Sequence, residues 1–85
     1  MRTYYSQIFL KNYKKLPKSI QSKLEKQEKI FRTNPFDPRL RTHPLTGKLK
    51  SFYSYSIDYH YRVVFHFEKE DEIWFENIGT HAIYK

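Results

Sequence analysis

The spacing of apolar residues changes along this sequence of 85 residues, and the change limits the folds open to it. Near the N-terminus Phe9, Tyr13 and Leu16 recur at intervals of four and three, which places them on one face of a helix. Between Tyr59 and Phe67 apolar residues instead recur at every second position, as along a strand with one buried face. The chain therefore has to combine helices with a sheet.

Two helices are predicted in the first part of the chain. The first begins after Ser6, a favourable N-cap residue, and ends at Leu16-Pro17 because proline disfavours helical backbone in the residue before it. The second begins at residue 18 or 19 and ends at Asn34-Pro35. Its apolar stripe consists of Ile20, Leu24, Gln27, Ile30 and Phe31. The two helices form a hairpin that needs a sheet to cover its apolar faces.

The sheet is predicted from four further runs of residues. A short β-prone run, Arg2 to Tyr5, precedes the helices, and an irregular, proline-rich segment from Asn34 to Gly47 follows them. The runs Leu49–Ile57, Tyr59–Phe67 and Glu72–Ile78 then predict an antiparallel meander. The order β-α-α-β-β-β predicts an α+β fold, with the N-terminal strand and helical hairpin on one face of a small twisted antiparallel sheet. The other face is left for function.

The middle strand and the chain length complete this prediction. Alternation assigns one set of its residues to the core, namely Tyr61, Val63, Phe65 and Phe67. The opposite face then carries His60, Arg62, Val64, His66 and Glu68. A chain of 85 residues supports one core, so residues 1–85 are predicted to form a single domain.

The composition favours a cytoplasmic protein. There is no cysteine, and small extracellular domains usually depend on disulfides or on thiolate-bound metal. No run approaches the roughly 18 apolar residues of a membrane span, and Met1-Arg2 does not begin a signal peptide. We therefore expect a protein of the cytoplasm with no membrane partner.

Positive charge is concentrated in the first part of the chain. Residues 1–50 contain thirteen Lys or Arg and three acidic residues, whereas residues 51–85 contain three and six. This segregation favours a polyanionic partner, which could be RNA, DNA or an acidic protein. The alternative is that the lysines only keep basic helices soluble.

Three segments of the sequence resemble the RelE/ParE superfamily of toxins. They are Leu40–Lys50 with its HxLxG loop, Ile57–Phe65 with a YRxxF strand, and Ile78–His81 with a GTH ending. In this order they are most similar to the YafQ, YoeB and RelE ribonuclease branch. The resemblance implies cleavage of messenger RNA, often on the ribosome, by attack of a ribose 2′-hydroxyl on the adjacent phosphate. It implies no metal or other cofactor, and a cognate antitoxin as protein partner.

Such a reaction needs a proton acceptor, a proton donor and a cation for the phosphate. His43 and His81 lie in two of the motifs, and histidine can perform either proton transfer at neutral pH. Arg62 can offer forked donors to the phosphate, and all three residues are the predicted catalytic set. The alternatives are a surface histidine at the terminus, a structural histidine in the loop, and an arginine paired across the sheet with Glu76 or Asp58.

Other residues are predicted to hold RNA or to assist. Lys48 and Lys50 would follow RNA phosphates from one side of a strand, and Arg41 lies in the same basic segment. Tyr84 either stacks on a base or closes the core at the terminus. Asp58 and His60 fall near positions where YafQ-like members carry further site residues.

One departure from the pattern concerns Arg39. It stands about where some YoeB-like members carry an acidic residue, so their acid–base arrangement is not expected here.

Three other functions remain open at this stage. A ParE-like inhibitor of DNA gyrase would share the fold without the catalytic set, and a non-catalytic RNA- or ribosome-binding module would use the same basic surface. A metal site is disfavoured, because no cysteine and no helical histidine pair accompanies the four histidines, His43, His60, His66 and His81.

Overall fold

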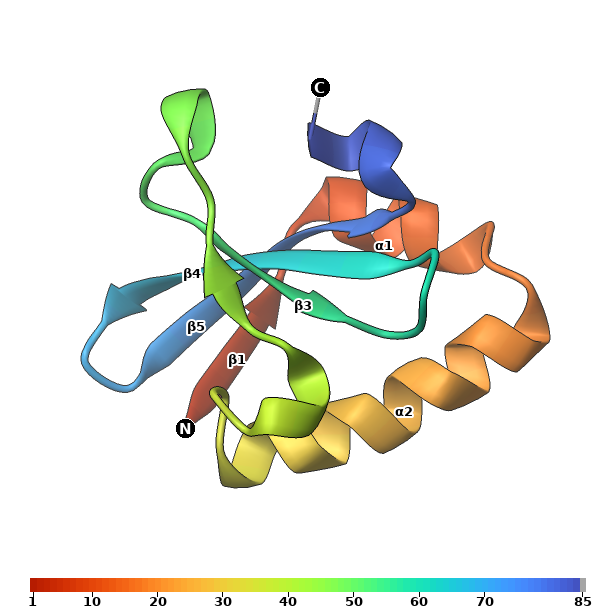
Figure 1. Ribbon diagram of the computed structural model, residues 1–85, viewed down its shortest axis with the longest axis horizontal. Coiled ribbons are helices and arrows are strands. Elements are labelled where there is room, and N and C mark those ends of the chain that lie inside the picture. The colour runs from red at the N-terminus through yellow and green to blue at the C-terminus, as the bar shows by residue number, and fades with distance from the viewer. Residues whose placement is uncertain (85) are drawn as a thin grey trace.

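The computed structural model describes residues 1–84, as two helices and a five-stranded sheet (Figure 1). The main elements are β1 (Arg2–Tyr5), α1 (Gln7–Lys14), α2 (Lys18–Thr33), β2 (His43–Pro44), β3 (Tyr53–Ser56), β4 (Arg62–Lys69) and β5 (Glu72–Gly79). Short 3-10 turns cover Pro38–Leu40, Gly47–Leu49 and His81–Tyr84. The predicted α+β fold and its element order are confirmed, with one short strand, β2, added.

The sheet has the strand order β1-β5-β4-β3-β2. The meander β3-β4-β5 is antiparallel as predicted, but β1 pairs with β5 in parallel, so the sheet is mixed. The helical hairpin connects β1 at one edge of the sheet to β2 at the other edge. The last strand, β5, then pairs with β1. A four-residue strand does not reveal its partner, which is why sequence alone predicted a purely antiparallel sheet.

Helix α1 begins as its sequence predicts. The Ser6 hydroxyl oxygen accepts a hydrogen bond from the Phe9 N–H at 3.0 Å, which caps the helix, and donates one to the Glu76 carbonyl at 2.7 Å. The cap residue therefore also fixes the start of the helix against β5.

Aromatic rings dominate the core between the helices and the sheet. Phe31 of α2 is fully buried and its ring centroid lies 5.2 Å from Tyr55, 4.9 Å from Phe65 and 5.2 Å from Phe75. Each of the three sheet residues belongs to a different strand, so one helical side chain joins β3, β4 and β5.

Two strand boundaries differ from prediction. The run Leu49–Ile57 contains only β3, because Gly47, with a φ of 66°, starts a 3-10 turn. The strand predicted from Tyr59 begins instead at Arg62, because the Asp58 carboxylate accepts the N–H groups of His60 and Tyr61 and closes a turn.

The predicted faces of β4 also need correction at two positions. Val64 lies on the face away from the helices but is only 3% exposed, and Phe67, expected in the core, is 38% exposed. Val64 pairs in register with Ser54, which the C-terminal turn covers, and Phe67 lies beside a bulge at the end of the strand. The second face of the sheet is thus partly covered.

Candidate functional site

The first and last motifs meet over strand β3. His43 in β2 pairs in register with Ser54 in β3, and the Ser54 hydroxyl lies 2.5 Å from the Tyr84 hydroxyl of the C-terminal turn. The Tyr84 ring packs against the His81 ring with a centroid distance of 5.6 Å. The β2–β3 segment and the C-terminal turn also extend toward the same end of the view in Figure 1. One hydrogen bond therefore joins the turn that carries His81 to the strand that pairs with His43.

His43 is exposed, and its ring is oriented by the backbone before it. Its Nδ1 lies 3.0 Å from the Arg41 carbonyl oxygen, which can only accept, so Nδ1 carries the proton. In the neutral ring the lone pair is then on Nε2, the nitrogen that can accept a proton.

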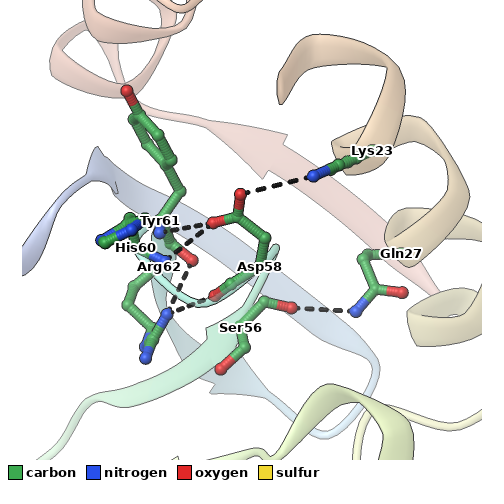
Figure 2. Close-up of polar contacts among 7 residues, drawn as sticks. All are labelled: Lys23, Gln27, Ser56, Asp58, His60, Tyr61 and Arg62. Carbon is green, nitrogen blue, oxygen red and sulfur yellow. Dashed lines mark hydrogen bonds and ion pairs between the residues drawn. The ribbon is translucent and has the colours of Figure 1, made fainter. Parts of the chain in front are cut away.

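Arg62 begins β4 and is held by backbone carbonyls (Figure 2). Its Nη1 donates to the Asp58 carbonyl at 2.5 Å and to the Tyr61 carbonyl at 3.1 Å. Among residues 1–84 the guanidinium forms no ion pair with an acid, and the Glu76 carboxylate lies instead 3.1 Å from His66 Nδ1. The charge of Arg62 is therefore positioned but not neutralised, unlike the cross-strand pair that sequence had left open.

Strand pairing brings the backbone of Arg62 next to the last motif. Its Cα partners are Ser56 in β3 and Gly79 in β5, and Gly79 is two residues before His81. The three predicted catalytic residues thus come from three motifs, and strand register places the backbone segments that carry them near one end of the sheet.

Asp58 and His60 belong to the β3–β4 turn. Partial burial raises the pKa of Asp58, but the N–H groups of Tyr61 and His60 and the Lys23 ammonium, 3.6 Å away, outweigh it, so this pKa lies below its usual value. Figure 2 shows the carboxylate facing these groups. His60 is exposed and packs edge-on against Tyr59. This geometry gives both residues a role in the turn.

The predicted RNA-binding residues differ in exposure: the three basic residues are exposed, and Tyr84 is half-buried. Lys48 and Lys50 are exposed, but they belong to the 3-10 turn and its cap rather than to a strand, so strand alternation does not align them. Arg41 is exposed with a positive φ of 55°. Tyr84 is half-buried and bonded to Ser54, which fits a residue that closes the terminus better than a free stacking platform.

Sequence reasoning missed two residues that support the site. Ser54 is fully buried and holds Tyr84, yet nothing in the Tyr-Ser-Tyr-Ser run distinguishes it. Gly79 lies so close to the C-terminal turn that an added Cβ would be 2.7 Å from Cγ2 of Ile83. Its place in the GTH motif was the one available signal.

The lysines of the two helices form a separate basic surface. Lys11, Lys14, Lys18, Lys26 and Lys29 are all exposed on the helical layer. The site residues Ser54 and Arg62 lie on the other side of the sheet from the Tyr55 and Phe65 side chains that contact α2. Net charge alone therefore does not locate the site.

Residues 1–84 also lack a metal-binding cluster and a membrane-spanning helix. Within this part of the chain no three His, Asp or Glu side chains are grouped so as to hold a metal ion. Its two α-helices are too short or too polar to cross a membrane.

Comparison with protein-family models and with curated proteins gives no match. Solved structures do match. YafQ from E. coli strain BL21(DE3) is 22% identical with a TM-score of 0.82, over 99% of this chain and 98% of that one. The YoeB/ParE toxin from Agrobacterium tumefaciens is 15% identical with a TM-score of 0.80, over 95% and 99%.

A third match is YafQ in the E. coli DinJ-YafQ toxin-antitoxin complex, 24% identical with a TM-score of 0.78, over 95% of this chain and 92% of that one. At these identities and this coverage the similarity establishes the fold along nearly the whole chain. The chain therefore has the fold of the RelE-like toxins, as seen in YafQ and YoeB.

Proposed function

We propose that this chain is the toxin of a type II toxin–antitoxin system and a metal-independent endoribonuclease that cuts messenger RNA while the ribosome reads it. One observation carries the proposal: His43, His81 and Arg62 come from separate motifs and lie around one end of the sheet, linked by strand register and the Ser54–Tyr84 bond. The likeness to YafQ and YoeB supports the toxin assignment. The protein would act in the cytoplasm, where ribosomes and messages are.

In the proposed reaction the ribose 2′-oxygen attacks the adjacent phosphorus and the bond to the 5′-oxygen breaks. The products are a 2′,3′-cyclic phosphate and a free 5′-hydroxyl. His43 takes the 2′-hydroxyl proton on Nε2, which its hydrogen bond to the Arg41 carbonyl leaves free. His81 gives a proton to the departing 5′-oxygen.

Arg62 stabilises the charge that builds up on the phosphate. Its Nη1 is fixed by two carbonyls, while among residues 1–84 its Nε and Nη2 form no hydrogen bond. These nitrogens can therefore donate to phosphate oxygens without first breaking other contacts. Lys48, Lys50 and Arg41 would bind phosphates along the RNA chain, and Tyr84 would position His81.

The second proposed partner is an antitoxin. The formal charge of +7 favours an acidic or mixed-charge chain that covers the basic surface. The complex of YafQ with DinJ supports such a partner.

The experiment is cleavage of a message during translation, with cut sites mapped for wild type, His43→Ala, His81→Ala and Arg62→Ala. Because ribosomes need Mg²⁺, the translation assay uses EDTA-stripped protein in buffer with Mg²⁺ as the one divalent ion, and free RNA off the ribosome is assayed with EDTA present to test metal independence. His66→Ala and Arg2→Ala are matched controls outside the site.

Wild-type and control proteins should cut, and each site variant should lose at least about 100-fold in rate while remaining folded. If stripped wild type does not cut on or off the ribosome, the ribonuclease proposal is wrong. Inhibition of gyrase would then be measured.

A further inference from the structure

A hollow of about 290 Å³ lies beside Arg62, and neither of the two proposed catalytic histidines is among its lining residues. Three arginines from two segments of the chain line it: Arg39 and Arg41 in and just after the 3-10 turn that follows α2, and Arg62 in β4. Its lining residues are Gln27, Arg39, Arg41, Ser56, Ile57, Asp58, Tyr59 and Arg62. Figure 2 shows the part of this wall formed by Gln27, Ser56, Asp58 and Arg62.

The positive charge of the hollow is only partly balanced. Arg39 is paired with Asp37 through two contacts of 3.0 Å. Asp58 is the one acid in the lining, and its carboxylate is occupied by two backbone N–H groups and by Lys23. Arg41 and Arg62 therefore face the hollow without a carboxylate partner among residues 1–84, which favours an anionic ligand.

The backbone at Arg41 links the hollow to His43. Its φ of 55° is a left-handed conformation that is uncommon for a residue with a side chain. The Arg41 N–H donates to the Pro38 carbonyl at 3.2 Å, and its carbonyl accepts from His43 Nδ1 at 3.0 Å. The same strained residue thus lines the hollow and orients a predicted catalytic ring with its carbonyl.

Tyr59 adds a flat surface at the hollow. It is 82% exposed, although it is a large aromatic residue, and one edge contact with the His60 ring, at a centroid distance of 5.0 Å, supports it. An exposed aromatic ring beside unpaired guanidinium groups is the pairing that single-stranded nucleic acids use, with phosphate on the cations and a base on the ring. An acidic protein segment would use the cations but not the ring face.

We infer that the hollow is a second RNA subsite, in which Arg41 binds the phosphate next to the one being cut and Tyr59 stacks on the neighbouring base. This inference rests on the proposed ribonuclease function. Arg62 lines the hollow and, in the proposed reaction, would also stabilise the phosphate being cut, so the two sites would share one wall. Substrate would then be recognised as a single strand over at least two nucleotides.

Binding is measured without cleavage, by fluorescence anisotropy with a short single-stranded RNA whose riboses are all 2′-O-methylated and cannot attack. The variants are Tyr59→Ala and Arg41→Asn, since asparagine tolerates the left-handed backbone but carries no charge. Matched controls are Tyr4→Ala and Arg2→Ala on strand β1, and Arg41→Lys restores the charge. Thermal melting verifies that each variant is folded.

Tyr59→Ala should weaken binding roughly 10-fold, which corresponds to the loss of one stacked base. Arg41→Asn should lower the slope of log affinity against log salt by about 0.7, the value for one phosphate contact on a single strand, and Arg41→Lys should restore it. Both controls should bind like wild type.

The outcomes separate this inference from the proposed function. If wild type binds the methylated RNA with these variant effects but never cuts unmodified RNA, the subsite stands and the ribonuclease proposal fails. If wild type cuts RNA while Tyr59→Ala and Arg41→Asn bind as wild type does, the subsite is wrong. Poly-L-glutamate is tested in parallel. If Arg41→Asn binds poly-L-glutamate more weakly than wild type but binds RNA equally well, the hollow is a protein-docking site and the inference is overturned.

Discussion

Replacing Tyr84 with phenylalanine tests how the C-terminal turn is held. The change removes one hydroxyl and leaves the ring, so the Ser54 hydroxyl, 2.5 Å away and fully buried, loses its partner. A buried hydroxyl left without a hydrogen-bond partner costs about 1–3 kcal/mol. Residues 81–84 contain no buried side chain, so this cost falls mainly on the docking of the turn rather than on the whole domain.

The expected kinetic effect follows from that energy. A loss of about 1–3 kcal/mol lowers an equilibrium constant by roughly 5- to 150-fold. If His81 acts only when its turn is docked, the cleavage rate of Tyr84→Phe falls by up to this factor, while the melting temperature changes little. Amide exchange should accelerate at Ile83, whose N–H donates to the Thr80 carbonyl at 3.0 Å within the turn.

A double-mutant cycle tests whether the Ser54–Tyr84 hydrogen bond holds the C-terminal turn in place. Ser54→Ala combined with Tyr84→Phe removes both partners, and replacing both is far less costly than removing one. The double variant should therefore recover much of the rate that Tyr84→Phe loses, and Tyr4→Phe at the far edge of the sheet should match wild type. Strictly additive effects, or a wild-type rate in Tyr84→Phe, would refute the role given to this hydrogen bond.

Three further predictions concern stability and the same turn. Phe31→Ala should cost about 3–5 kcal/mol in urea unfolding, because this ring is fully buried against three strands, whereas Phe36→Ala, 51% exposed, should cost much less. Gly79→Ala should displace the C-terminal turn and reduce cleavage with little change in urea midpoint, because its Cβ would lie 2.7 Å from Ile83; a wild-type rate would contradict this. Asp58→Asn should be less stable than wild type at pH 7. Because folding lowers the pKa of Asp58, its contribution to the free energy of unfolding is present above the unfolded pKa of about 4 and disappears as pH falls through the folded pKa. A stability difference between Asp58→Asn and wild type that does not shrink in acid would contradict this assignment.

The helices and the meander were predictable because their signals are local. The Ser6 cap and the Phe9 stripe mark α1, and Pro17 separates the two helices. Alternation identified β4 but not its ends, since the turn at Asp58 depends on a side-chain carboxylate and the bulges depend on the partner strand. The parallel pairing of β1 and the two-residue strand β2 arise from tertiary contacts.

The candidate site was predictable only in part. The order of three motifs indicated that His43, Arg62 and His81 belong together, and the strand register brings their segments to one end of the sheet. The buried Ser54 hydroxyl carried no signal, because its neighbours repeat the same residue types. The hollow joins a helix, a turn and a strand end, and no periodicity in sequence could have related Gln27 to Tyr59.

The most direct test of the central claim is the chemistry of the cut ends. Mass spectrometry of the products from a defined RNA, and from the same RNA with a 2′-deoxy sugar at the cut position, identifies the attacking group. The proposed mechanism gives a 2′,3′-cyclic phosphate and a 5′-hydroxyl from the first RNA, and no cut at that position in the second. A 5′-phosphate end, or equal cutting of the deoxy substrate, would show that water rather than the 2′-hydroxyl attacks and would rule this mechanism out.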